Sequence, residues 1–256
     1  MSRDIENINL QLMMQNLYQS GKYYASIGGR ANAEFEEDYW ELIKDPDGAV
    51  RNRLLERDSF ISDISLELDF IKSLKPGKVL DVGCGLGWLL SALDDKWLKY
   101  GLEVSNFASK YAEKYAEIKT GELLNCSYDD NTFDLVVMHH VIEHMQEPEL
   151  NINYIKRILK SNGHLIIATP DFDSGCARRF GSKYRLLSDD THISLFSNDS
   201  MHRFLRDFGF KILRVEYPFF DTKHFSRNNL DKMFDLTTTS PPFYGNFMTF
   251  ICINGK

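Results

Sequence analysis

A glycine-rich turn between an apolar strand and a helix constrains the fold of this chain more than any other feature. Residues 78–82 predict a short buried strand, and residues 88–93 predict a helix. The turn between them holds three glycines at a spacing of two: Gly83, Gly85 and Gly87. Glycines leave the backbone bare, and the start of the helix presents unpaired N–H groups, so a flat ligand can lie directly on this turn.

The glycine spacing and the residue before the turn indicate which ligand this site would hold. A dinucleotide site has the pattern G-x-G-x-x-G, whereas here the pattern is G-x-G-x-G and Trp88 stands where the third glycine would fall. Asp81 lies just before the turn, where a carboxylate would repel phosphate but would tolerate a cation. We therefore expect a cationic ligand, and we interpret Cys84 as a small residue that fits the turn rather than as a nucleophile.

A second carboxylate lies at the end of the next predicted strand, residues 98–103. Glu103 ends that strand, about 20 residues after Asp81, where nucleoside-binding α/β sites place an acidic residue that accepts hydrogen bonds from both ribose hydroxyls. Such charge-assisted bonds contribute on the order of 1.5–3 kcal/mol. Taken alone, Glu103 would be a solvated loop charge, but in register with the glycine turn it predicts a ribose ligand.

Strands and helices alternate from residue 77 onward. Further strands are predicted over 117–121, 133–138, 164–169, 210–217 and 246–254, and further helices over 106–116, 148–160 and 198–208. This order predicts an α/β fold with a doubly wound, mostly parallel, seven-stranded sheet. No strong helix separates the last two strands, so one of them is expected to be antiparallel.

Three regions fall outside this alternation. Residues 1–75 are predicted to form a helical region or lid before a ligand-binding domain at 76–256. Residues 170–197 and 218–244 are long excursions after strands, and long excursions in a compact domain are usually functional. Because ligands of open α/β sheets bind beyond the carboxyl ends of the strands, we expect these excursions to form a cap over an acceptor substrate.

Composition excludes several classes of function. A net charge of −7 argues against a nucleic-acid partner, which requires a basic face. No apolar stretch approaches the ~18 residues of a membrane span, and the N-terminal residues lack an apolar secretory core. The four cysteines are far apart, which argues against a zinc site or disulfides. We expect a cytoplasmic monomer or homodimer with no membrane partner.

Residues 77–215 resemble the class I S-adenosylmethionine-dependent methyltransferases. The glycine turn corresponds to their first motif, residues 101–105 to the ribose-binding segment, residues 131–145 to the fourth-strand motif and residues 158–170 to the fifth. Residues 190–197 are similar to the small-molecule branch, which includes ubiquinone-pathway O-methyltransferases and enzymes of surface-polysaccharide and natural-product clusters.

The resemblance implies a Rossmann-like fold that binds S-adenosylmethionine and releases S-adenosylhomocysteine. It implies cosubstrate-binding roles for two sets of residues. The methionine part would lie against Asp81, Gly83, Cys84, Gly85, Gly87 and His139. The ribose and adenine would lie against Glu103, Val104, Glu122 and Leu123.

Methyl transfer needs alignment of the acceptor and, for a hydroxyl acceptor, removal of its proton by a base. His192 is the first candidate, because it lies in the excursion 170–197 and its neighbours Asp190 and Thr191 could orient the imidazole. The alternative for His192 is a loop histidine bonded to backbone. His139 is the second candidate, because the resemblance places it near the transferring methyl group. His202 and His224 are expected to lie on the surface.

A possible metal motif follows the strand at 133–138. His140, Glu143 and His144 have the spacing H-x-x-E-H, and some ubiquinone-pathway relatives hold a divalent metal with E-x-x-E-H at this place. Here a histidine replaces the first carboxylate, which disfavours Mg²⁺ because that ion prefers oxygen ligands. We therefore expect no metal, and we interpret the Glu-His pair as a packing and hydrogen-bonding unit.

These observations favour a small-molecule O- or N-methyltransferase. A sugar or nucleotide-linked sugar is the first acceptor class, and a quinone-type phenol is the alternative. A nucleotide-dependent oxidoreductase and a non-catalytic relative that only binds S-adenosylmethionine are the remaining hypotheses. The glycine spacing and Asp81 argue against the oxidoreductase.

Overall fold

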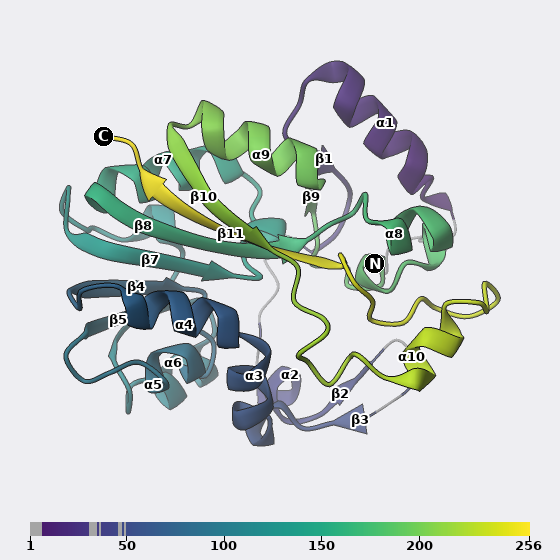
Figure 1. The fold of residues 1–256 in the computed structure, drawn as a ribbon. Helices are drawn as coiled ribbons and strands as arrows, with labels where there is room; N and C mark the ends of the chain where they lie inside the picture. The colour runs from purple at the N-terminus through teal and green to yellow at the C-terminus, as the bar shows by residue number, and fades with distance from the viewer. Residues whose placement is uncertain (1–6, 31–34, 36, 46–47, 49) are drawn as a thin grey trace.

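The computed structural model describes residues 7–30, 35, 37–45, 48 and 50–256. At its centre is a seven-stranded sheet with the order β10-β11-β8-β7-β4-β5-β6 (Figure 1). The neighbours from β6 to β8 are parallel, and β11 is antiparallel to both β8 and β10. The predicted fold class is therefore confirmed. The strands are β4 (Lys78–Val82), β5 (Leu98–Glu103), β6 (Glu117–Thr120), β7 (Phe133–His139), β8 (Leu159–Pro170), β10 (Phe210–Glu216) and β11 (Phe247–Asn254).

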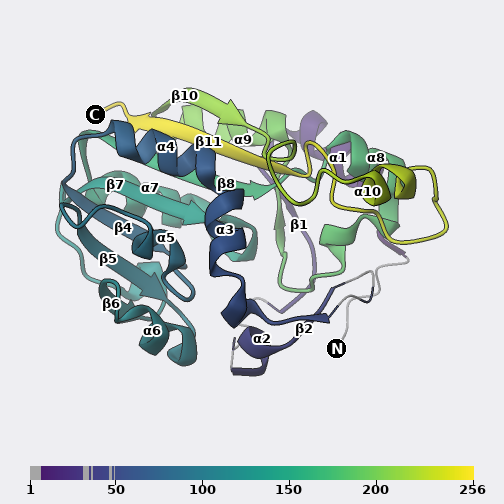
Figure 2. The ribbon, with the colours of Figure 1, turned by 60° about the horizontal axis from the view of Figure 1, so that its bottom comes forward.

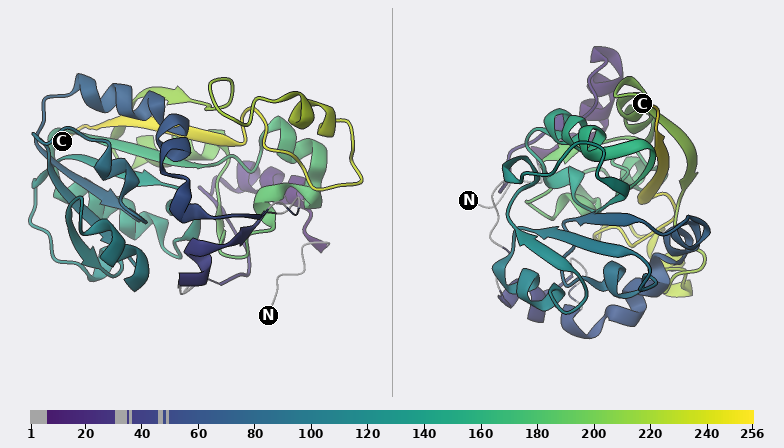
Figure 3. Two further views of the ribbon diagram at one scale, coloured as in Figure 1. Left: turned by 90° about the horizontal axis from the view of Figure 1, so that it is seen from below. Right: turned by 90° about the vertical axis from the view of Figure 1, so that its left-hand side faces the viewer.

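Helices cover both faces of the sheet, as the right-hand view of Figure 3 shows. Alternate strand residues point to opposite faces, so Leu80 and Val136 enter one core and Val79 and Leu135 enter the other. The first core is closed by α7 (Pro148–Ile158) and α9 (Asn198–Asp207). The second is closed by α4 (Ser65–Ser73), α5 (Trp88–Ser91) and α6 (Asn106–Ala112).

Strand β8 is longer than the predicted strand 164–169, because it begins directly after α7 ends. Asn162, which precedes Gly163, lies inside this strand with a left-handed φ of 60°. The pairing of β7 with β8 shifts in register between Phe133 and Leu135. Asn and Gly favour such a conformation, so the strand accommodates them as an irregularity instead of ending.

The N-terminal region is only partly helical, which corrects the prediction for residues 1–75. Besides α4 it contains α1 (Leu10–Ser20), α2 (Glu37–Glu41) and α3 (Arg57–Asp63), and also the two-residue strands β1 (Ala25–Ser26), β2 (Ile43–Lys44) and β3 (Val50–Arg51). Strand β2 pairs with β3, and β1 pairs with β9 (Ser194–Leu195) from the excursion 170–197. A strand of two residues has no readable alternation, so its pairing depends on a partner that the local sequence does not reveal.

A third core joins the N-terminal region to the excursion 170–197. Leu10, Met14 and Leu17 of α1 pack with Phe172 and with residues of α8 (Gly175–Phe180). Helix α3 lies between the sheet and β2 (Figure 2). The N-terminal region therefore contributes buried residues to two cores, because α4 packs on the sheet and α1 packs on the excursion. The division of the chain at residue 75 stays a prediction.

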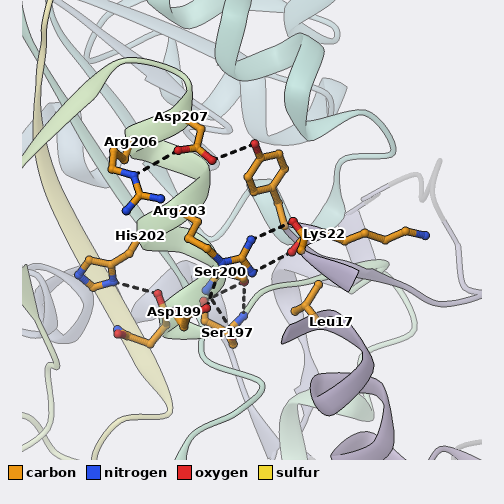
Figure 4. A network of polar contacts seen from close by, with 12 residues as sticks. Leu17, Lys22, Ser197, Asp199, Ser200, His202, Arg203, Arg206 and Asp207 are labelled. Atoms are coloured by element: carbon orange, nitrogen blue, oxygen red, sulfur yellow. Dashed lines mark hydrogen bonds and ion pairs between the residues drawn. The ribbon is translucent and has the colours of Figure 1, made fainter. Parts of the chain in front are cut away.

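Polar contacts attach the segment after α1 to α9 (Figure 4). The Arg203 guanidinium donates hydrogen bonds to the carbonyls of Gly21 and Lys22 at 3.0 and 2.9 Å, and the Tyr23 hydroxyl donates to Asp207 at 3.2 Å. The Tyr23 ring also packs on Phe204. This segment is thus held against α9.

No helix in the described part of the chain is long and apolar enough to cross a membrane.

Candidate active site

A cavity of about 690 Å³ opens beyond the carboxyl ends of β4, β7 and β8. The glycine turn and His139 form its inner wall. The outer wall is formed by residues within 39–45 of the N-terminal region, 185–192 of the first excursion and 222–224 of the second, and it includes His192. Segments far apart in sequence therefore meet over the strand ends, where open α/β sheets bind their ligands.

The glycine turn has a backbone that side chains rarely allow. Gly83 and Gly87 have left-handed φ angles of 69° and 75°, and a Cβ atom at Gly83 would lie 2.5 Å from Val141 Cγ2. Gly87 also caps the start of α5. Burial raises the pKa of the Cys84 thiol, with Asp81 as a second cause, which agrees with a packing role for Cys84.

Asp81 is 3% exposed at the end of β4 and lies in the cavity wall. Burial, reinforced by the charge of Glu103, raises the pKa of Asp81 to about 8. A buried carboxyl of this kind is stabilised in its ionised form by a neighbouring cation. The Asp81 site therefore fits the ammonium or sulfonium end of a ligand, as the sequence predicts.

Glu103 is buried and bonded to the backbone on both sides of the predicted pocket. One oxygen accepts a hydrogen bond from Gly85 N at 2.8 Å, and the other accepts from Ser105 N at 2.9 Å. Burial raises the pKa of Glu103, and these N–H groups oppose that rise. The carboxylate thus ties the glycine turn to the start of α6, which the sequence did not predict.

The residues predicted to bind the nucleoside part of the cosubstrate do not line the cavity in this conformation. Among the described residues that line it, Glu103, Val104, Glu122 and Leu123 are absent. Val104 and Glu122 are exposed elsewhere, and Leu123 is buried in the first core. Their cosubstrate-binding roles stay predictions.

Trp40 lies between the cavity and these residues. The indole N–H is 3.2 Å from Ser105 Oγ and 3.1 Å from the Phe35 carbonyl oxygen. The neighbouring Tyr39 ring carries the Arg53 guanidinium 4.0 Å from its centroid. Sequence reasoning missed Trp40, because nothing in an aromatic-rich N-terminal stretch distinguishes a residue over the pocket from a packing residue.

His139 stands at the carboxyl end of β7 in the cavity wall, as predicted. Burial lowers its pKa to about 3, with the neighbouring His140 as a second cause, so the imidazole is neutral at physiological pH. Its Nε2 lies 4.0 Å from Oε1 of Glu67, a buried residue of α4. Glu67 was also missed, because a lone acidic residue in an amphipathic helix is normally solvated.

His192 lies in the cavity wall with only 7% exposure. Its Nδ1 is 2.6 Å from the Leu186 carbonyl, a geometry in which Nδ1 donates and Nε2 keeps a lone pair. Nε2 lies 3.9 Å from Asp189 Oδ2. Burial lowers the pKa of His192, and Asp189 opposes this. The neutral tautomer with a lone pair on Nε2 is the form that can accept a proton.

The prediction that Asp190 and Thr191 orient the imidazole of His192 is wrong. Asp190 forms an ion pair with Arg30 at 2.9 Å. The carbonyl of Thr191 lies 3.0 Å from His144 Nδ1. Leu186 and Asp189 take the orienting role, because the chain turns between residues 186 and 192 and brings these groups back onto the ring.

The H-x-x-E-H motif is split by the fold. His140 Nδ1 lies 3.1 Å from Glu143 Oε1, and Thr169 Oγ1 donates to Glu143 Oε2 at 3.0 Å. Burial opposes ionisation of Glu143, but the hydrogen bond from His140 and the nearby imidazoles lower its pKa to about 2. Glu143 is thus hydrogen-bonded to His140, whereas His144 contacts the Thr191 carbonyl, so the bonded pair differs from the adjacent Glu143 and His144 that the sequence indicated.

A different set has the spacing of metal ligands. One ligand atom each of Glu143, His144 and His192 lies within 4.8 Å of the others. Two imidazoles and one carboxylate suit a transition metal better than Mg²⁺. This set includes His192 instead of the His140 of the sequence motif, a difference that only the tertiary structure could reveal. The expectation that no metal is needed stays a prediction.

Charged groups surround the outer end of the cavity. Arg51 pairs with Asp45 at 2.9 Å and also with Glu56. His224, expected on the surface, is half-buried in the cavity wall. Burial, followed by the charge of Lys223, lowers the pKa of His224 to about 4. The surface assignment of His224 is therefore wrong, because the excursion folds back over the strand ends.

A family model described as a methyltransferase domain matches residues 53–215. The chain belongs to this family. This match confirms the resemblance to the class I S-adenosylmethionine-dependent methyltransferases, and it spans the glycine turn, β7 and the excursion 170–197.

Similar proteins extend the comparison. An uncharacterized methyltransferase from Schizosaccharomyces pombe is 29% identical over 161 residues, which cover 54% of this chain and 56% of that protein. A ubiquinone biosynthesis O-methyltransferase from Pelagibacter ubique is 27% identical over 156 residues, which cover 54% and 61%. The chain thus spans less than two thirds of these relatives. An S-adenosylmethionine-dependent methyltransferase structure from Thermotoga maritima shares the fold with a TM-score of 0.56 and 22% identity, covering 78% of this chain and 92% of that one.

Proposed function

We propose that this protein is an S-adenosylmethionine-dependent methyltransferase that methylates an oxygen or nitrogen atom of a small polar molecule. The observation that carries the proposal is the cavity at the strand ends. It combines the buried Asp81 and the glycine turn with the neutral imidazoles of His139 and His192. Membership of the methyltransferase domain family supports the same conclusion.

The residues divide the chemistry between two walls. Bound S-adenosylmethionine supplies a methyl group that its positively charged sulfur already activates. Asp81 stabilises the cationic end of that molecule, and the bare backbone of Gly83 and Gly85 lets it lie close to β4. The outer wall aligns the acceptor in line with the methyl group, and excludes water.

His192 acts as the base for a hydroxyl acceptor. Its Nε2 lone pair would take the hydroxyl proton while the oxygen bonds to the methyl carbon; the bond between that carbon and the sulfur would break, and S-adenosylhomocysteine would leave as a neutral thioether. The imidazole becomes a cation, which Asp189 stabilises from 3.9 Å. An acceptor amine requires alignment only. The burial that lowers the pKa of His192 keeps the ring ready to accept a proton at neutral pH.

The acceptor is a sugar or a nucleotide-linked sugar. Cations such as Arg185 and Lys223 alternate with carboxylates such as Asp45 and Asp189 around the outer end of the cavity. Such a lining offers both donors and acceptors to the many hydroxyl groups of a sugar, more than the one or two hydroxyls of a flat phenol would use. The aromatic side chains Trp40, Phe60 and Trp88 lie toward the glycine turn.

A quinone-type phenol is the second candidate acceptor class. It is favoured by the similarity to a ubiquinone biosynthesis O-methyltransferase and by the cluster of Glu143, His144 and His192. A metal in that cluster would engage Nε2 of His192, so the two candidates assign different roles to one residue. Their dependence on metal therefore separates them.

Two measurements test the proposal. Calorimetry should show binding of S-adenosylhomocysteine and no comparable binding of NADH or NADPH. Methyl transfer from labelled S-adenosylmethionine to a panel of nucleotide-linked sugars and catechols should then identify the acceptor class. Tight NADH binding without any response to S-adenosylhomocysteine would overturn the proposal.

A further inference from the structure

The indole of Trp40 covers the middle glycine of the turn. A Cβ atom built on Gly85 would lie 3.1 Å from Cη2 and 3.4 Å from Cζ3 of the indole, so the six-membered ring rests directly on the glycine. On its other side the indole N–H donates to Ser105 Oγ and to the Phe35 carbonyl. Trp40 therefore bridges the turn after β4 and the turn after β5.

The carboxylate of Glu103 lies under this bridge. It accepts hydrogen bonds from the N–H groups of Gly85 and Ser105, the same two residues that Trp40 contacts. Glu103 is 5% exposed and is not among the described residues that line the cavity, although Gly85 and Trp40 are. A ligand in the cavity can thus reach Asp81 and His139 but not the carboxylate proposed to hold its ribose.

The helix that carries Trp40 is attached by few contacts. Helix α2 has five residues, none of them buried, and its Tyr39 and Trp40 are the half-buried members. A helix of this length is not stable on its own and depends on the contacts of these two side chains. None of the three cores described above contains a residue of α2, so its displacement from the glycine turn would leave those cores intact.

We propose that Trp40 closes the nucleoside end of the cosubstrate pocket, and that cosubstrate binding displaces its indole from Gly85 and Ser105. This inference rests on the proposed function, because it takes Glu103 as the ribose ligand. Trp40 then sets the cosubstrate affinity, since only molecules with the indole displaced can bind the whole ligand. The apparent dissociation constant exceeds the intrinsic one by the inverse of the open fraction.

Affinity for S-adenosylhomocysteine tests this assignment by calorimetry on the full chain. Trp40→Ala should bind at least fivefold more tightly than the unmodified protein, with a faster association rate in stopped-flow measurements. Trp40→Phe should fall between the two, because it keeps a ring on Gly85 but loses both indole hydrogen bonds. Trp97→Phe is the control, since Trp97 is buried in the second core away from the cavity and should leave the affinity unchanged.

Tryptophan fluorescence gives a second readout that does not depend on the alanine variant folding. Binding of S-adenosylhomocysteine should shift the emission as the Trp40 indole leaves its contacts. The shift should disappear in Trp40→Phe and persist in Trp97→Phe. Because Trp88 also lines the cavity, all of these spectra are recorded in a Trp88→Phe background, in which Trp40 and Trp97 are the two remaining tryptophans.

The outcomes separate this inference from the proposed function. Weaker or unchanged binding by Trp40→Ala would overturn it, as would a fluorescence shift that survives in Trp40→Phe. In either case the protein still binds S-adenosylhomocysteine, and the proposed function stands. Failure of every folded variant to bind that molecule would contradict the proposed function itself.

Discussion

The glycine turn and the cap over it are built in opposite ways. Residues 78–105 form two adjacent parallel strands, and the proposed ligands Asp81 and Glu103 end those strands. The outer wall takes residues from the N-terminal region and from both excursions, and no two of these segments are neighbours in sequence. The proposed cosubstrate side is thus encoded locally, while the proposed acceptor side forms only after long-range packing.

The largest expected effect tests the local side. Gly85→Val should abolish binding of S-adenosylhomocysteine, because Gly85 has a left-handed φ of 52° and a valine side chain would enter the cavity. Gly181→Val is the matched control, since Gly181 has a φ of 56° with open space around it. Calorimetry measures both variants after circular dichroism has verified their folds. Equal affinity of the two variants for S-adenosylhomocysteine would mean that the glycine turn matters no more for binding than a glycine elsewhere in the chain.

Loss of a base on the acceptor side should have the next largest effect. His192→Ala should lower turnover of a hydroxyl acceptor by ~10²–10⁴-fold, the usual contribution of a general base. Its affinity for S-adenosylhomocysteine should stay nearly unchanged, because His192 lies in the outer part of the site. His202→Ala is the control, since its Nδ1 also contacts a backbone carbonyl but His202 lies on α9.

If His192→Ala lost both turnover and affinity for S-adenosylhomocysteine, the inner and outer walls would not have separate roles in binding and in catalysis. With an amine acceptor, the loss of turnover should shrink to the cost of poorer alignment.

A smaller effect is expected at the second strand. Glu103→Ala should weaken S-adenosylhomocysteine binding by about tenfold, which corresponds to losing about 1.4 kcal/mol of hydrogen bonding to the ribose. Glu113→Ala, just after α6, is the control. Unchanged affinity in folded Glu103→Ala would mean that the second carboxylate only ties the glycine turn to Ser105.

Asp81 should make stability depend on pH. Its pKa is raised in the folded protein to about 8, so the folded state holds a proton that the unfolded state has already released. The free energy of unfolding should therefore fall as pH rises from about 4 toward 8, and Asp81→Asn should lose less of it. Denaturant unfolding across this range measures the difference. A steeper fall in Asp81→Asn would contradict the assignment.

The smallest expected effect concerns metal. We expect a chelator to leave turnover unchanged, because His192 acts through its lone pair and Glu143 already accepts from His140 and Thr169. Turnover with and without chelator measures this once an acceptor is known. Activity that is lost and then restored by a divalent cation would assign Glu143, His144 and His192 as ligands and favour the phenol acceptor.

The strands of the sheet could be predicted from the sequence because a local run of apolar residues indicates each of them. The apolar runs at β4 and β7 and the alternation with helices were sufficient to predict a mostly parallel, seven-stranded sheet with one antiparallel strand, but not the order of its strands. The same reasoning missed β1, β2 and β3, since two residues carry no pattern. It also placed His224 on the surface, because its burial depends on the path of an irregular excursion.

For the site, the sequence identified the groups but not their partners. Asp81, His139 and His192 all lie in one cavity, as expected from their positions after strands or in the excursion. The partners Leu186 and Asp189 of His192, the Glu67 carboxyl beside His139 and the Trp40 cover on Gly85 were not foreseen. Each is a contact across a long or irregular stretch, where hydrophobic periodicity gives no information about direction.

The sequence by itself determined the glycine turn, the carboxylates at the ends of two strands and hence the family of folds. These features depend on backbone conformations and on spacings within about 25 residues, which neighbouring side chains fix through sterics and periodicity. The tertiary structure decided which histidine faces which carboxylate and which aromatic ring covers Gly85. Those choices follow from packing three distant segments over one sheet edge, and packing is a property of the whole chain.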